Sequence, residues 1–471
     1  MGRVACQFAA WSLAAWAVLP PNLAAGQGAA APVSGGIPAV QPGPGGPAPV
    51  QSPRSEPFVP AVSRHDTNHK DWTVVVDLRL LGVQPVDNTE RLTVVPTQKV
   101  KLTEATMLFP LLQESASHEV WDDRIVSTFG IESRVLVRQP RFLTGYPAFT
   151  RLGAWDVHDV STNTLRLHVE LPMICWETRI DEKAAARYGW PKGPWPEDVA
   201  LCLEPQLLVE STSPEIDALT KRWLSESPGG ADPRRTPPYV LAKYLTGRVV
   251  AHYQPTGNTI DTRGRGRNSL NYSGSTIAGF AVLGAAAAAR DGRGPPLDGA
   301  NLLTAVLRAA GIPARLVIGY DVQIQQDQEQ GKQGGGGGGL AGFGGPPMHS
   351  WVEFLLYNEA AGRGEWVPAD VRKQREFSSR PPPLNQRWLF FGHHEGLDML
   401  CPIAFHWLPP TVCMNSGSPA LWGWVPDPES VHVDPDIRIF ARATARRADD
   451  PPRSTPAPGG KMRPKPGDST R

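Results

Sequence analysis

An amphipathic segment between residues 297 and 310 places the strongest constraint on how this chain can fold. Its apolar side chains recur every three or four residues, which is the period of one face of an α-helix. They are Leu302, Leu303, Val306, Leu307 and Ala310. Pro295 and Pro296 stand at the expected first turn, where a helix accepts proline best, and Gly311 follows where helices commonly end. The pattern therefore predicts a helix with a buried face over residues 297–310.

Three β-rich segments follow this helix. Residues 315–322 are rich in β-branched and other apolar side chains, and residues 349–356 alternate large apolar side chains with others. Residues 365–370 form a shorter segment of the same kind. The sequence predicts one strand for each segment, with His349 opening the second strand and Asp370 closing the third.

Several motifs in this region occur in the order found in the transglutaminase-like superfamily, which the region resembles. The matching stretches are residues 300–303, 307–315, 319–320, 349–353 and 366–370. Agreement of several separate motifs in one order argues against coincidence. The resemblance implies an α+β fold, in which a papain-like transglutaminase-like domain, with a helix packed on an antiparallel sheet, is preceded by a β-sandwich domain.

The resemblance also implies a triad of cysteine, histidine and aspartate. His349 and Asp370 stand at the positions of the histidine and the aspartate. In the family's pattern the cysteine begins the helix, four residues before the alanine that Ala300 matches here, and that position holds Pro296.

Pro296 removes the chemistry of such a triad. A thiolate must attack a carbonyl while the imidazole moves protons and the carboxylate orients the imidazole, and proline has neither a nucleophilic atom nor a backbone N–H. No shift of register supplies a thiol, because residues 295–299 contain no cysteine and the nearest in the sequence are Cys202 and Cys401. Loss of a nucleophile costs about 10⁶-fold in rate in a comparable serine enzyme. We therefore predict a catalytically degenerate site.

Two other interpretations stay open at the level of sequence. Asp298 could replace the thiol, although a carboxylate would need a different geometry and would pass through a mixed anhydride. Alternatively, His349 could be a core histidine with a backbone partner, and Asp370 could cap a turn ahead of Arg372 and Lys373.

The N-terminus has the pattern of an export signal. A basic start at Arg3 is followed by a mostly apolar run over residues 4–19, and Ala24 and Gly26 are the small residues expected before a cleavage site. We predict a signal peptide over residues 1–26 and an exported mature chain, periplasmic or extracellular, that begins at Gln27. An uncleaved anchor is the alternative, and we find no other apolar stretch of membrane-spanning length.

Removal of the signal would remove Cys6 and leave an even number of cysteines, which are Cys175, Cys202, Cys401 and Cys413. Two disulfides are plausible in an exported chain, and the pairs 175–202 and 401–413 would each close a short loop. The sequence does not fix the pairing, and four buried free thiols are the alternative.

Residues 390–398 contain His393, His394 and Glu395, which superficially suggest a metal site. The two histidines lack the i, i+4 spacing of a zinc helix, and no two of the four cysteines have metal-ligand spacing. We interpret this segment as structural, and we predict no metal and no cofactor.

Composition divides the rest of the chain. Residues 27–62 are dominated by Pro, Gly, Ala and Ser and predict a flexible linker, and residues 443–471 predict a disordered tail rich in Pro and Arg. Strand candidates at 72–78, 91–95, 134–137 and 165–171 predict a β-sandwich-like domain over residues 63–212. The transglutaminase-like domain is predicted over residues 213–442.

The formal net charge is +1 and the pI is near 7.7. Proteins that bind nucleic acid usually carry an excess of positive charge, so we do not expect nucleic acid as a partner. Two classes of function remain. The first is a pseudoenzyme that holds a peptide, a protein or a cell-envelope component. The second is an active protease, amidase or acyl transferase on peptide amides, using a nucleophile that the sequence does not reveal.

Overall fold

The computed structural model describes residues 60–84, 97–112, 115–146, 150–256, 282–333, 348–408 and 421–444. All of them lie in Phe58–Arg471, the second of two compact units in the chain. The predicted signal peptide, almost all of the predicted linker and tail, and Cys413 lie outside the described residues.

Two antiparallel sheets form the N-terminal half. The smaller sheet has the order β17-β2-β7-β6, and the larger sheet contributes β5-β4-β8-β1-β18, with β3 also paired to β8. The strands of the smaller sheet are β2 (Val100–Pro110), β6 (Arg141–Tyr146), β7 (Thr150–Thr162) and β17 (Gly423–Asp427). Those of the larger sheet are β1 (Val62–Gly82), β3 (His118–Val120), β4 (Val126–Ile131), β5 (Arg134–Val137), β8 (Thr164–Ile180) and β18 (Val433–Ala443). The sheet-rich region expected ahead of the transglutaminase-like domain is therefore confirmed.

Alternation of side chains along the strands creates the core of this half. The inward positions of β1, each at most 2% exposed, are Val74, Val76, Leu78 and Leu80. Asp77 and Arg79, between them, are not buried, because a period of two sends alternate side chains to opposite faces. Phe109 of β2 and Trp155 of β7 belong to the same apolar cluster, so the inner faces of the two sheets pack as a sandwich. Three of the four strand candidates lie in β1, β5 and β8, and the candidate at 91–95 lies outside the described residues.

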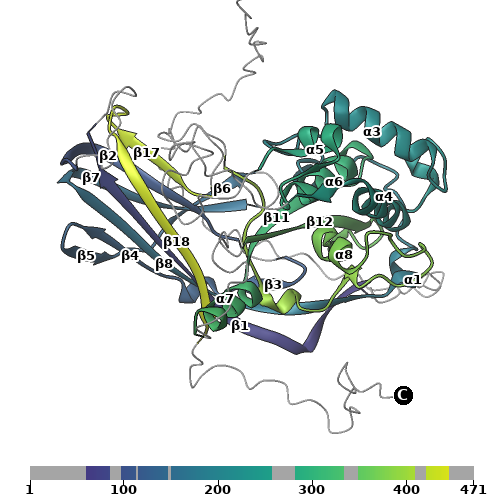
Figure 1. Cartoon of the computed structure of the whole chain (residues 1–471), viewed down its shortest axis with the longest axis horizontal. Helices are drawn as coiled ribbons and strands as arrows, with labels where there is room; N and C mark the ends of the chain where they lie inside the picture. The colour runs from purple at the N-terminus through teal and green to yellow at the C-terminus, as the bar shows by residue number, and fades with distance from the viewer. Residues whose placement is uncertain are drawn as a thin grey trace, which may run out of the picture. The chain divides into compact units, whose positions relative to one another are not determined.

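Helices gather beside the strands of the second half, as Figure 1 shows for α3, α4, α5 and α6 near β11 and β12. The main helices are α3 (Pro214–Ser225), α4 (Pro238–His252), α5 (Ala285–Asp291), α6 (Asp298–Ala309), α7 (Val322–Gln333) and α8 (Val371–Phe377). The strands are β11 (Ala314–Asp321), β12 (Met348–Asn358), β13 (Arg363–Ala369), β14 (Phe390–Phe391), β15 (His393–His394) and β16 (Leu400–Ala404). Short elements are η1 (Asp122–Arg124), α1 (Glu182–Ala185), α2 (Glu197–Ala200), η3 (Pro233–Arg235), β9 (Gln254–Pro255), β10 (Arg293–Gly294) and η5 (Leu397–Met399).

One continuous sheet joins the two halves. Its order is β16-β11-β12-β13-β14-β15-β8-β1-β18, so strands of the second half pair through β15 with β8 of the first. After the second half, the chain returns to the N-terminal sheets: β17 pairs with β2, and β18 pairs with β1. The end of the described chain thus completes the two N-terminal sheets, while the predicted boundaries at 62/63, 212/213 and 442/443 stay predictions.

The predicted helix over 297–310 is confirmed as α6. It begins at Asp298, so Pro295 and Pro296 precede its first turn rather than forming it. Gly311 has φ +84°, a left-handed conformation that favours glycine and ends the helix. Nearly every side chain of α6 is buried, because α4 and α5 cover it on one side and β11 and β12 on the other.

Substitution of Leu303 in α6 tests this burial, because the Leu303 side chain is 0% exposed. We expect Leu303→Ala to lower the free energy of unfolding by about 2–5 kcal/mol, since it removes buried methyl groups and leaves a cavity. Leu207→Ala is the matched control: its side chain is 39% exposed, so the expected loss is below about 0.5 kcal/mol. Urea unfolding of both variants measures the difference. Equal losses would contradict the placement of α6 in the core.

Candidate functional site

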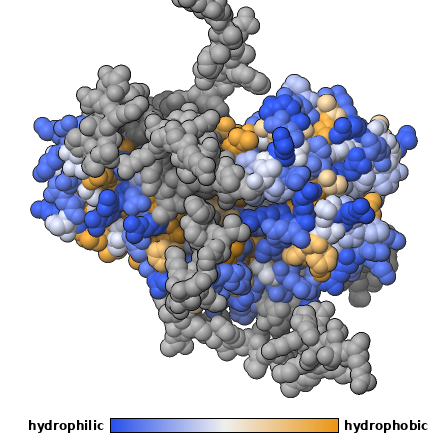
Figure 2. All heavy atoms as spheres, in the orientation of Figure 1, coloured by the Kyte–Doolittle hydropathy of each residue, from blue (hydrophilic) through white to orange (hydrophobic). Residues whose placement is uncertain are grey.

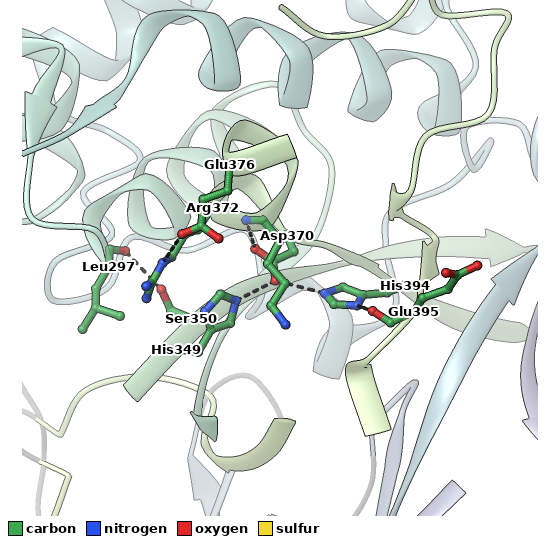
Figure 3. A network of polar contacts seen from close by, with 9 residues as sticks. Leu297, His349, Ser350, Asp370, Arg372, Glu376, His394 and Glu395 are labelled. Atoms are coloured by element: carbon green, nitrogen blue, oxygen red, sulfur yellow. Dashed lines mark hydrogen bonds and ion pairs between the residues drawn. The ribbon is translucent and has the colours of Figure 1, made fainter. Parts of the chain in front are cut away.

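Two neighbouring strands bring His349 and Asp370 together. His349 lies near the start of β12, and Asp370 directly follows β13, which pairs with β12 in antiparallel register. His349 Nε2 lies 2.6 Å from Asp370 Oδ2 (Figure 3). The two side chains are 1% and 0% exposed, so this hydrogen-bonded pair is removed from solvent. The residues predicted from the sequence are therefore in direct contact.

Asp370 also caps the helix that follows it. It is the N-cap residue of α8, and its Oδ1 atom accepts a hydrogen bond from the Lys373 backbone N–H at 2.9 Å. A capping carboxylate satisfies one of the free donors of the first helical turn. The capping role considered for Asp370 and its pairing with His349 are thus present together, one on each carboxylate oxygen.

A second histidine reaches the same carboxylate. His394 of β15 places its Nε2 atom 3.0 Å from Asp370 Oδ2, on the other side from His349 (Figure 3). Burial alone would raise the pKa of Asp370, but the two imidazoles hold it well below its usual value. From the sequence alone, the segment that contains His394 is interpreted as structural. The contact depends on the short β13-β14-β15 pairing, which leaves no periodic signal in the sequence.

The start of α6 lies against the strand that carries His349. The Ser350 hydroxyl, one residue along β12, donates to the Leu297 carbonyl at 3.3 Å (Figure 3). The Tyr253 hydroxyl donates to the Pro295 carbonyl at 2.7 Å. The residues on both sides of Pro296 are therefore held in place.

The Asp298 carboxylate accepts three hydrogen bonds. One oxygen accepts from the Leu283 N–H at 2.8 Å, and the other accepts from the Gly284 N–H and the Asn301 amide at 3.1 and 2.8 Å. Burial raises the pKa of Asp298 to about 6, although these hydrogen bonds oppose the rise. Both oxygens already have donors, which argues against Asp298 as a substitute nucleophile.

Three cysteines lie within the described residues. Cys175, Cys202 and Cys401 are buried and are not joined in disulfides, so the pairing of Cys175 with Cys202 does not form. The Cys401 thiol contacts Cys175, and burial together with that contact raises its pKa well above the usual value, which disfavours a thiolate.

Cys401 is also separated from His349 by a strand. Cys401 pairs with Tyr320 of β11, whereas His349 pairs with Gly319 on the opposite edge of that strand. Adjacent positions such as Gly319 and Tyr320 direct their side chains to opposite faces of the sheet. The Cys401 side chain therefore lies on the other face of the sheet from His349.

Within the described segments, no group of three or more His, Cys, Asp or Glu side chains is arranged to hold a metal ion. The same segments contain no helix that is long and apolar enough to cross a membrane.

Comparison with known proteins identifies the domain that contains these residues. Residues 248–371, from within α4 to the start of α8, match the family model of the transglutaminase-like superfamily. The chain thus contains a transglutaminase-like domain, which follows a sheet-rich region. No curated protein matches the chain.

Two solved structures are similar at low sequence identity. A "putative cysteine protease" from Cytophaga hutchinsonii is 12% identical with a TM-score of 0.44, and the match covers 82% of this chain and 93% of that one. A "putative protease" from Parabacteroides distasonis is 12% identical with a TM-score of 0.20, and the match covers 57% of this chain and 63% of that one.

Asp370→Asn tests the energetic role of the shared carboxylate. We expect the variant to lose about 3–5 kcal/mol of unfolding free energy at neutral pH, because two buried imidazoles lose their anionic partner. Since the pKa of Asp370 is depressed in the fold, its charge stabilises the protein above the ordinary value of 3.8. That contribution is lost as the pH falls through the lower folded pKa. Urea unfolding at several pH values should show the gap between wild type and variant narrowing only in acid.

Asp181→Asn provides the control for helix capping. Asp181 caps α1 through the backbone N–H groups of Lys183 and Ala184 and has no imidazole partner. Asparagine caps nearly as well as aspartate, so this variant should lose only a few tenths of a kcal/mol. Similar losses in both variants would show that Asp370 acts as a cap alone.

Proposed function

We propose that this chain is an exported, catalytically degenerate transglutaminase-like protein whose site binds its ligand without acyl transfer. The observation that carries the proposal is a buried His349–Asp370 pair at 2.6 Å with Pro296 at the position matched to the nucleophile. The ligand class is a peptide, a protein or a cell-envelope component. Export rests on the predicted signal peptide over residues 1–26.

The chemistry of the pair supports binding over catalysis. An imidazole oriented by a carboxylate is useful to an acyl transferase because it takes the proton of a nucleophile and returns it to the leaving group. Here Cys401 is separated from His349 by β11, and both oxygens of Asp298 accept hydrogen bonds. An oriented imidazole without a nucleophile can still exchange hydrogen bonds with a bound peptide. The site therefore keeps the positioning half of the mechanism and lacks the bond-forming half.

The direct test combines turnover and binding. The mature chain should show no amine incorporation and no peptide cleavage above the uncatalysed rate when incubated with amine donors and peptide libraries. It should retain peptides or envelope fragments in an equilibrium binding assay, and His349→Ala should weaken that binding. Turnover that disappears in His349→Ala would instead establish the alternative function, an active protease, amidase or acyl transferase with a nucleophile of its own.

Pro296→Cys tests the placement of the missing thiol. We expect this cysteine to react with alkylating reagents at least about 10-fold faster than a free thiol, because a neighbouring imidazole lowers the pKa of a thiol. The reactivity should fall to an ordinary rate when His349→Ala is added. The rate of alkylation at neutral pH, followed by mass spectrometry, is the measurement.

Pro295→Cys is the matched control, because Pro295 neighbours Pro296 but is buried and its carbonyl is held by Tyr253. Its thiol should react slowly. Equal rates in the two cysteine variants would contradict the alignment of Pro296 with the nucleophile.

A further inference from the structure

When Asp370 is ionised, each ring nitrogen of His394 faces an oxygen atom that accepts hydrogen bonds and cannot donate one. Nε2 lies 3.0 Å from Asp370 Oδ2, and Nδ1 lies 3.1 Å from the Glu395 main-chain oxygen. A neutral imidazole carries one N–H and one lone pair, so it can satisfy only one of these contacts. A ring that donates from both nitrogens is an imidazolium.

We propose that His394 is a positioning residue that carries a fixed positive charge and thereby keeps His349 neutral. Asp370 Oδ2 accepts one N–H from each ring, at 2.6 Å from His349 and 3.0 Å from His394. The three side chains are 0–1% exposed, so water does not screen their charges. One anion and one cation balance in this arrangement, and a second imidazolium at His349 would leave an excess buried positive charge.

Among the hydrogen bonds of His394 to the described residues, the one to Asp370 is the contact with a carboxylate. The Phe390 ring packs edge-on against the imidazole, and Lys373 of α8 contributes only its backbone N–H to Asp370. The neighbouring His393 is directed towards Arg387 and the Glu395 carboxylate instead. Depression of the pKa of Asp370 by both imidazoles agrees with an ionised carboxylate between them. Asp370 is thus the anion that balances His394.

The tautomer of His349 follows from this balance. Its proton sits on Nε2, where it is donated to Asp370, and Nδ1 keeps a lone pair that receives no hydrogen bond from the described residues.

Nitrogen NMR of the ¹⁵N-histidine-labelled full chain tests the charge without any ligand. Near neutral pH, we expect His394 to show two protonated ring nitrogens and His349 to show one protonated Nε2. A single protonated nitrogen on His394 in the wild-type chain would overturn the proposal. Because these spectra are recorded without ligand, failure of the binding assay leaves this test unaffected.

His394→Gln separates charge from hydrogen bonding, since the glutamine amide can still donate to Asp370 but carries no charge. We expect His349 in this variant to take up a proton and show two protonated nitrogens. His393→Gln, one residue away and without contact to Asp370, should leave the His349 spectrum unchanged. A neutral His349 in a folded His394→Gln variant would also overturn the proposal, and if that variant does not fold, the wild-type spectrum of His394 decides.

Discussion

The burial of the Asp370 carboxylate is the constraint on which the site depends. A lone anion in a protein interior costs several kcal/mol, and it is tolerated only when hydrogen-bond donors surround it. Asp370 obtains three donors, from His349 on β12, His394 on β15 and the backbone of Lys373 in α8. Because these donors come from separate elements, the carboxylate fixes two strands and a helix relative to one another. Removing it would disturb the fold as well as the site.

The strands that carry the site are reinforced by a second buried ion pair. Arg315 of β11 and Glu353 of β12 are directly opposite in register, and their side chains approach to 2.7 Å at 1% and 0% exposure. The guanidinium also lies between the rings of Trp366 and Phe405, at 4.0 and 3.8 Å from their centroids. This pair holds β11 and β12 in the register that places His349 opposite Gly319. The scaffold thus positions an imidazole accurately.

The contacts of Asp370 with its neighbours also stabilise the fold. The same carboxylate caps α8 and joins β12 to β15, so the pair stabilises the fold whether or not a thiol is present. The structural and functional interpretations of His349 and Asp370 are therefore not exclusive.

Local sequence patterns determined the parts of this protein that depend on neighbouring residues. The spacing from Leu302 to Ala310 defined α6, Gly311 marked its end, and the order of motifs brought His349 and Asp370 together, because helical and strand periods are set within a few residues. Only the tertiary structure placed His394 on the same carboxylate and returned β17 and β18 to the N-terminal sheets. Those contacts depend on the pairing of short or distant strands, whose register is fixed by packing across the whole sheet and not by the residues beside them.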